Sequence, residues 1–114
     1  MSYKYTEGTT YIIRGDIKMR IPTPKISEIL KEEFMDPLHL SAYSVAKAIQ
    51  VPTSRIQDLL HDRRAISVDT SVRLGKFFGV SERFFFDLQT DIDIRNAKEK
   101  NSKVYNGIKQ YQPQ

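Results

Sequence analysis

Polar side chains that can pair with DNA bases are concentrated in residues 52–64. In a helix over this segment, Ile56, Leu59 and Leu60 would face inward and leave the polar residues on the opposite side. Arginine and glutamine make paired hydrogen bonds to guanine and adenine in the major groove, and small hydroxyls suit several bases. The candidate DNA-contacting residues here are Thr53, Ser54, Arg55, Gln57, Asp58, His61, Arg63 and Arg64. The pattern favours DNA binding over its alternative, an ordinary helical hairpin with a solvated polar face.

A second helix in front of this segment would hold it in place. Its apolar residues repeat with the i, i+3, i+4, i+7 spacing of one helix face, at Ala42, Val45, Ala46 and Ile49. Pro52 separates the two helices, because the residue before a proline avoids the α region and proline suits a first helical turn. Ser41 would cap the earlier helix, whose start could then hold a phosphate oxygen. Two short helices joined this way predict a helix-turn-helix.

Further helices are needed to support this pair. They are expected over residues 24–34, 68–78 and from 82 to about 97. Thr23 and Ser67 would cap the first two of these, and Gly79 would end the second in the left-handed conformation. The residues of the 68–78 helix expected to face inward are Val72, Leu74, Phe77 and Phe78. Together these elements predict one all-α, five-helix domain over residues 19–97.

The two ends of the chain differ in composition from this domain. Residues 1–18 contain the β-branched and aromatic run Thr9–Ile13 and the turn signal Gly15–Asp16. They therefore predict a short β strand or hairpin, or a loose arm. Residues 98–114 are polar and basic with few core-forming side chains, which predicts a flexible tail.

The fifth expected helix carries more apolar surface than a domain of this size needs. Three successive phenylalanines point in three helical directions, so at least one must leave the home core unless the helix is buried from several sides. A cluster of exposed apolar residues marks an interface, and a two-fold dimer is its symmetric solution. The predicted dimer interface comprises Phe84, Phe85, Phe86, Leu88 and Ile92. Two recognition helices about a two-fold axis would fit successive major grooves about one helical turn apart.

The composition argues against several other functions. The net charge is +4 and the pI about 9.4, which weakly favours an anionic partner. No cysteine is present, so disulfides and zinc–thiolate sites are excluded. His39 and His61 lack the spacing of metal ligands, and no phosphate-binding glycine loop or nucleophile elbow occurs, so no enzyme, metal or cofactor is expected. Without an apolar run of membrane-spanning length or a signal peptide, a cytoplasmic protein is expected.

Residues 40–64 resemble the helix-turn-helix of phage repressors, and residues 19–98 resemble the HigA antitoxins of bacterial toxin–antitoxin modules. The wider resemblance rests on matching words in an unbroken order: Arg20–Pro24, Ile29–Phe34, Val51–Ile56, Arg64–Ile66, Asp69–Thr70, Arg73–Leu74, Phe77–Gly79 and Leu88–Gln89. Family members usually have glycine where Gln50 and Asp62 stand. Both are expected left-handed turn positions, which these residues adopt at a modest cost.

The resemblance implies two compatible functions. HigA-type antitoxins bind a HigB-type toxin, a small ribosome-dependent messenger-RNA endonuclease, and repress their own operon. This chain would therefore neutralise such a toxin by direct binding and, as a homodimer, bind double-stranded operator DNA. The expected toxin contacts are Ile29, Lys31 and Glu32, together with the N-terminal arm, because an acidic patch suits a basic ribonuclease. The alternative is a stand-alone helix-turn-helix repressor without a toxin partner.

Overall fold

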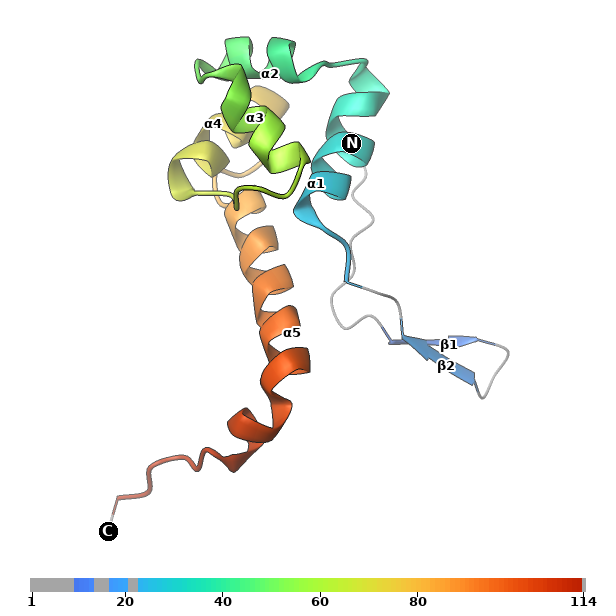
Figure 1. Ribbon diagram of the computed structural model, residues 1–114, viewed down its shortest axis with the longest axis vertical. Coiled ribbons are helices and arrows are strands. Elements are labelled where there is room, and N and C mark those ends of the chain that lie inside the picture. Colours follow the sequence, from blue (N-terminus) through green and yellow to red (C-terminus); the bar gives the residue numbers. More distant parts are fainter. Residues whose placement is uncertain (1–9, 14–16, 21–22, 114) are drawn as a thin grey trace.

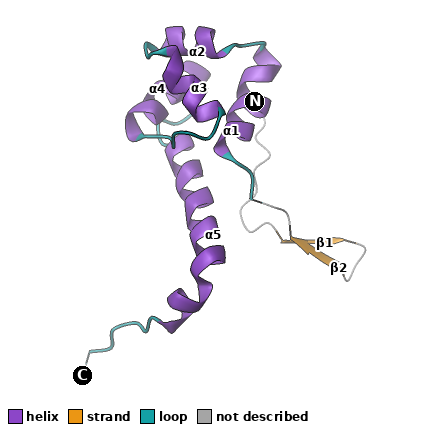
Figure 2. Cartoon of the chain, viewed as in Figure 1, coloured by secondary structure: helices purple, strands orange, loops and turns teal. Residues whose placement is uncertain are grey.

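Helices make up most of the chain between residues 23 and 113 (Figures 1 and 2). The computed structural model describes residues 10–13, 17–20 and 23–113. In chain order, these residues form strands β1 (Thr10–Ile13) and β2 (Ile17–Arg20), then helices α1 (Ile26–Ile29), α2 (Ala42–Ile49), α3 (Thr53–Leu60), α4 (Val68–Phe78) and α5 (Phe84–Gly107). A π-helical turn, η1 (Leu30–Met35), and a 3-10 turn, η2 (Asp36–Leu38), continue α1. The predicted all-α, five-helix fold is confirmed, and two short strands precede the helices.

The N-terminal β segment is a two-stranded antiparallel hairpin. In it, Thr10 pairs with Arg20 and Ile13 pairs with Ile17. Its second strand ends at Arg20, beyond the predicted boundary at residue 18. Residues 1–9, 14–16 and 21–22, which include the rest of the predicted extension and its turn, lie outside the described residues.

The first helix begins later than its sequence signals suggest. Its N-cap is Lys25, whose backbone is extended with φ −90° and ψ 149°, and no side chain makes a capping hydrogen bond there. The prediction that Thr23 caps a helix starting at Pro24 is therefore wrong, because the backbone stays extended through Lys25. Asp36 and Pro37 form the 3-10 turn in which the helix ends.

The core is built from residues of α1, η1, α2, α3, α4 and α5, and Phe34 of η1 packs there against phenylalanines of α4 and α5. The centroid of the Phe34 ring lies 4.9 Å from that of Phe85 and 5.2 Å from that of Phe78. Tilted aromatic pairs of this kind add to the stabilisation gained by burying the rings. Ile56 and Leu59 of α3 are fully buried in the same cluster. The helix-turn-helix is thus anchored to the core that also holds α5.

Small residues of α4 allow it to approach α5 closely. Its buried residues are Thr70, Ser71, Leu74 and Gly75. A Cβ atom on Gly75 would lie 2.7 Å from the carbonyl oxygen of Ser81, so glycine is required where the chain enters α5. This packing leaves Phe77 exposed and Val72 half-buried, which makes the prediction that both face inward wrong.

α5 extends well beyond the other helices (Figure 1). Its two helical segments meet at Asn101, where φ is −121° and ψ is 26°. The second segment ends at Gly107, so the first part of the predicted flexible tail, from Lys98, continues the helix. In the described part of the chain, no helix combines the length and the apolarity needed to cross a membrane.

Candidate nucleic-acid interface

α3 is held with its polar face toward solvent. Gln50 ends α2 in the left-handed conformation with φ 62°, as expected at that position, and Pro52 is the extended N-cap of α3. The sharp turn directs Ile56 and Leu59 into the core, where both are fully buried. On the opposite side, Ser54, Gln57 and His61 are exposed, and Thr53 is half-buried at the first turn. The structure therefore places the predicted base-reading side chains where a duplex can reach them.

Arg55, one of the predicted base-reading residues, is held by an ion pair to a neighbouring helix. Its Nη1 donates to Oδ2 of Asp69 in α4 at 3.0 Å, and Nε of Arg73 donates to the same oxygen at 2.9 Å. Nη1 of Arg73 also donates to the carbonyl oxygen of Ile49, at the end of α2, at 2.8 Å. The Arg73 hydrogen bond is the main cause that lowers the pKa of Asp69 below its ordinary value.

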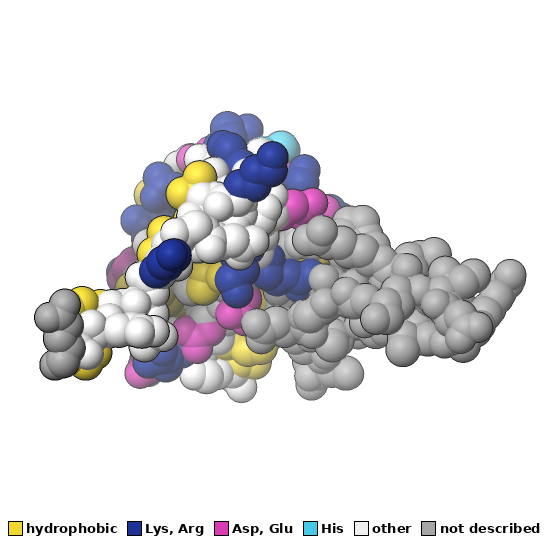
Figure 3. Space-filling view, turned by 90° about the horizontal axis from the view of Figure 1, so that it is seen from below, with side chains coloured by type: hydrophobic (Ala, Val, Ile, Leu, Met, Phe, Trp, Pro, Cys, Tyr) yellow, Lys and Arg dark blue, Asp and Glu magenta, His cyan; other side chains and the backbone are white. Residues whose placement is uncertain are grey.

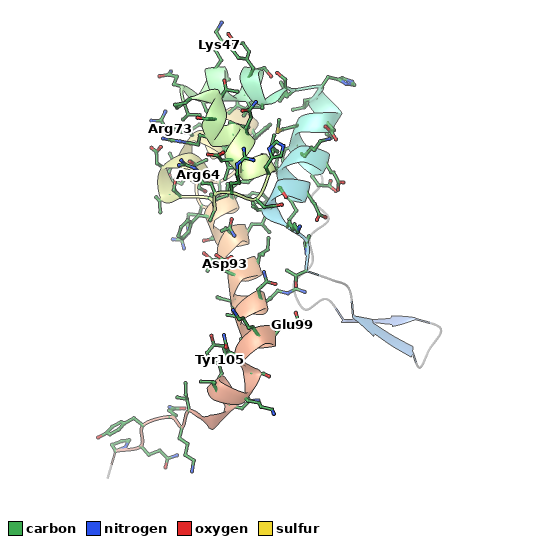
Figure 4. The ribbon with its side chains drawn as sticks, viewed as in Figure 1. Lys47, Arg64, Arg73, Asp93, Glu99 and Tyr105 are labelled. Carbon is green, nitrogen blue, oxygen red and sulfur yellow. The ribbon has the colours of Figure 1, made fainter. Side chains whose placement is uncertain are left out.

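This Arg55–Asp69–Arg73 network joins α2, α3 and α4, and no functional role was predicted for its two α4 residues. Their i, i+4 spacing in a helix was a visible signal for the Asp69–Arg73 pair. No comparable signal indicated the contact to Arg55, which lies fourteen positions before Asp69 in the chain. Figure 4 shows Arg73 at the edge of the helical body, on the side of α4.

The start of α2 forms the second part of the interface. The hydroxyl oxygen of Ser41 accepts the amide of Ser44 at 3.1 Å, and the hydroxyl oxygen of Ser44 accepts the amide of Ser41 at 2.9 Å. This reciprocal capping confirms the predicted cap and leaves the other amides of the first turn able to bind a phosphate oxygen. Lys47 extends outward from the same helix, 6.0 Å from the centroid of the exposed Tyr43 ring (Figure 4).

The loop after α3 carries the two arginines expected to hold the DNA backbone. Asp62 turns the chain in the left-handed conformation with φ 59°, as expected at that position. Nε of Arg63 donates to Oδ1 of Asp58 at 3.0 Å, and Nε of Arg64 lies 4.0 Å from Oδ2 of the same carboxylate. Asp58 therefore positions this basic loop through its carboxylate, whereas it was predicted only as one of the DNA-contacting residues. In Figure 3, Lys and Arg side chains crowd round a histidine at the upper edge of the molecule.

The predicted dimer residues divide into buried and exposed sets. Phe85 is fully buried, and Leu88 and Ile92 belong to the same core cluster. The prediction that these three residues contact a partner chain is therefore wrong, because their side chains fill the core of their own chain. Phe84 is half-buried against Phe34. Phe86 is 39% exposed, so one of the three phenylalanines does leave the core, as the pattern required.

Phe86 borders a hollow between α4 and the start of α5, lined by both apolar and polar residues. The hollow has a volume of about 240 Å³ and is lined by Val68, Ser71, Val72, Glu82, Arg83 and Phe86. The hydroxyl oxygen of Ser71 accepts the amide of Phe86 at 2.9 Å and donates to the carbonyl oxygen of Glu82 at 2.7 Å. These bonds fix the first turn of α5 against α4 and hold the Phe86 backbone beside the hollow.

The residues predicted to contact a toxin also divide by exposure. Ile29 is 5% exposed and packs in the core, so the prediction that it contacts a toxin is wrong. Lys31 and Glu32 are exposed on η1, where Nζ of Lys31 lies 3.0 Å from Oδ2 of Asp36. Within the described residues, no group of three or more His, Asp or Glu side chains is arranged to hold a metal ion.

Comparison with known proteins places this interface in a helix-turn-helix family. A family model described as helix-turn-helix matches residues 30–85, which span η1 to the start of α5. The chain is 34% identical over 87 residues to virulence-associated protein I of Dichelobacter nodosus, an alignment that covers 76% of this chain and 81% of that protein.

Two solved structures share the arrangement of the helices. The first is an addiction module antidote protein of a HigA family from Coxiella burnetii, which is 35% identical, with a TM-score of 0.72 over 80% of this chain and 100% of that one. The second is the Pseudomonas aeruginosa antitoxin HigA with the higBA promoter, which is 28% identical, with a TM-score of 0.73 over 80% and 100%. This chain therefore belongs to the HigA-type antitoxin family of helix-turn-helix DNA-binding regulators.

Proposed function

We propose that this chain represses transcription of its own operon by placing α3 in the major groove of a specific operator. The observation that carries the proposal is the exposed row of Ser54, Gln57 and His61 on a helix whose other face is fully buried. Amide and hydroxyl groups on such a row can form hydrogen bonds with base edges. The P. aeruginosa antitoxin HigA of similar fold was solved with its promoter, which supports the same mode of binding here.

The residues around α3 would fix the position of α3 on the DNA without contacting the bases. The start of α2 at Ser41 and the side chains of Arg63 and Arg64 can contact phosphates on either side of the groove. Phosphate contacts of this kind make binding strong at low salt and weaker as salt rises. Arg55, half-buried beside α4, would contact the same stretch of DNA as Gln57.

The repressor would act as a homodimer joined through the hollow beside Phe86. The exposed Val68 and Phe86 supply apolar area, while Glu82 and Arg83 supply adjacent opposite charges. In a two-fold interface, if residue i of one chain contacts residue j of the other, then j also contacts i, so Glu82 of each copy can pair with Arg83 of the other. Val68 also adjoins Asp69, which contacts α3. The proposal requires a two-fold axis here to bring the two recognition helices to neighbouring major grooves, about one helical turn apart.

The second part of the proposal is that the chain neutralises a HigB-type messenger-RNA endonuclease by direct binding. Related proteins named as an antitoxin and as an antidote protein support it. The exposed Glu32 on η1, with Lys31 beside it, is the surface proposed for the toxin. If no such toxin is encoded beside this chain, the alternative is a stand-alone repressor that uses the same DNA interface.

The DNA-binding proposal is tested by anisotropy titrations of the full chain on a duplex from its own promoter. Gln57→Ala should weaken specific binding by about 1–3 kcal/mol per half-site and relax the preference at one base position. The matched control is Gln110→Ala, which removes an exposed glutamine beyond α5 and should leave the affinity unchanged. Unchanged affinity in the Gln57 variant would contradict the proposed base contact.

Toxin binding is tested by co-purification with a small basic ribonuclease encoded beside this chain. The charge reversal Glu32→Lys should weaken the complex, whereas Glu99→Lys makes the same charge change on the far part of α5 (Figure 4) and should not. If both variants bind the toxin equally well, the toxin-binding surface does not include Glu32 of η1. Failure of the wild-type chain to bind its neighbour would favour the stand-alone repressor.

A further inference from the structure

Asp69 is an acidic residue beside the proposed DNA interface, where a negative charge should be unfavourable. Its side chain is 59% exposed, and it lies in the first turn of α4, directly after Val68. An exposed carboxylate close to DNA repels the phosphates and lowers affinity for every sequence. Its presence therefore requires an explanation other than attraction to DNA.

The explanation lies in what its Oδ2 atom holds. That single oxygen accepts Nη1 of Arg55 at 3.0 Å and Nε of Arg73 at 2.9 Å. Arg73 is itself fixed, because its Nη1 donates to the carbonyl oxygens of Ile49 at 2.8 Å and Gln50 at 3.3 Å. The carboxylate is thus anchored to the turn of the helix-turn-helix and in turn anchors Arg55.

Arg55 keeps the capacity to bind DNA while it is held. A guanidinium has five N–H donors in a rigid plane, and the bond to Asp69 uses a donor on Nη1. Its remaining donors can address a base edge or a phosphate. A long side chain that is already ordered loses less conformational entropy on binding, so a fixed guanidinium binds a matching acceptor more tightly and discriminates more strongly.

We infer that Asp69 is a positioning residue that fixes the guanidinium of Arg55 for specific contact with the operator. The inference rests on the proposed function, because it concerns how the proposed operator is distinguished from other DNA. The inference makes an unusual prediction. Removing the negative charge of Asp69 should weaken binding to the operator without weakening binding to other DNA sequences.

The test uses the full chain with two duplexes of equal length, the promoter site and a scrambled sequence. Asp69→Asn should weaken promoter binding about tenfold, within the range that one base contact carries. Binding to the scrambled duplex should stay equal or become tighter, because a negative charge has been removed. Asp36→Asn is the matched control: it removes an exposed carboxylate that pairs with Lys31 at 3.0 Å, and both affinities should stay within twofold or so of wild type.

A double-mutant comparison separates positioning from a purely structural role. In an Arg55→Ala background, Asp69→Asn should cause no further loss of promoter affinity, because the side chain that it positions is absent. A full tenfold loss in that background would show that Asp69 acts only through Arg73 and the fold, and would overturn the inference. Tighter promoter binding by Asp69→Asn alone would also overturn it, since Asp69 would then only mask Arg55.

A measurement without DNA also tests the inference, and it applies even if Asp69→Asn weakens DNA binding by destabilising the fold. In ¹⁵N relaxation, the Nε–H of Arg55 should be ordered in the wild-type chain and mobile in Asp69→Asn, while the backbone amide of Ile56 stays ordered in both. The Nε–H of Arg83, on a side chain that is 77% exposed and pairs with Oδ2 of Asp87 at 3.4 Å, gives an internal reference for an arginine in a longer, solvent-exposed ion pair. Equal order of Arg55 in both proteins would refute the inference. A wild-type chain that binds both duplexes equally would refute the proposed function, and this inference with it.

Discussion

Phe85 and Phe86 are adjacent in sequence, yet alanine at the two positions should give opposite results. Phe85 is fully buried, with its ring centroid 4.9 Å from that of Phe34 and 5.2 Å from that of Phe84. Its removal leaves a cavity that α1 and α5 cannot easily close, which costs about 3–5 kcal/mol of unfolding free energy. Phe86 is 39% exposed, so its loss should cost below about 1 kcal/mol in the single chain.

The two variants are compared with the wild type by urea unfolding at a protein concentration below that at which the wild type dimerises, because the apparent stability of a dimer depends on concentration. Sedimentation equilibrium then measures self-association. Phe86→Ala should unfold near the wild-type urea concentration but weaken the dimer, whereas Phe85→Ala should lower the unfolding midpoint strongly. The assignment of Phe85 to the core is refuted if its variant keeps wild-type stability. The interface at the α4–α5 hollow is refuted if Phe86→Ala associates like the wild type.

Three further changes probe the supports of the interface. Ser41→Ala removes a capping hydrogen bond at the start of α2 and should lower the unfolding free energy by about 1 kcal/mol in urea titrations. Gly75→Ala places a Cβ atom 2.7 Å from the carbonyl oxygen of Ser81 and should cost about 1–3 kcal/mol, with shifted amide resonances at the start of α5. Arg73→Ala removes the main cause of the lowered pKa of Asp69, so the pKa followed by carboxyl NMR should rise toward the ordinary 3.8. Because the pKa is depressed in the folded state, the stabilisation by charged Asp69 is present above 3.8 and is lost as pH falls through the folded pKa. In this variant the two pKa values lie closer together, so the loss should be smaller and should be complete at a higher pH.

Local signals predicted the helix-turn-helix because each acts within a few residues. Ser41 and Ser67 cap α2 and α4 as expected, and Gly79 ends α4 in the left-handed conformation. The positive φ values of Gln50 and Asp62 were expected from the resemblance to HigA antitoxins, which usually have glycine at these two turn positions. Such positions depend on backbone geometry over one turn, which the order of residue types specifies directly.

The orientation of the phenylalanines could not be predicted in the same way. Three successive residues cover most of the circumference of a helix, so the sequence shows that one must leave the core without showing which. The choice depends on the close approach of α4 at Gly75 and on the two bonds of the Ser71 hydroxyl. The Asp69–Arg55 contact was missed for the same reason, since it forms only when two helices have packed.

The recognition helix depends on α4 more than its position in the helix-turn-helix motif suggests. α3 has eight residues, and an isolated helix of that length is unstable in water, so its orientation must come from its contacts. Ile56 and Leu59 fix its depth in the core, but apolar contacts resist rotation about the helix axis only weakly. The Arg55–Asp69 bond lies away from the axis and resists that rotation. Substitutions in α4 that never touch DNA should therefore alter which bases α3 reads.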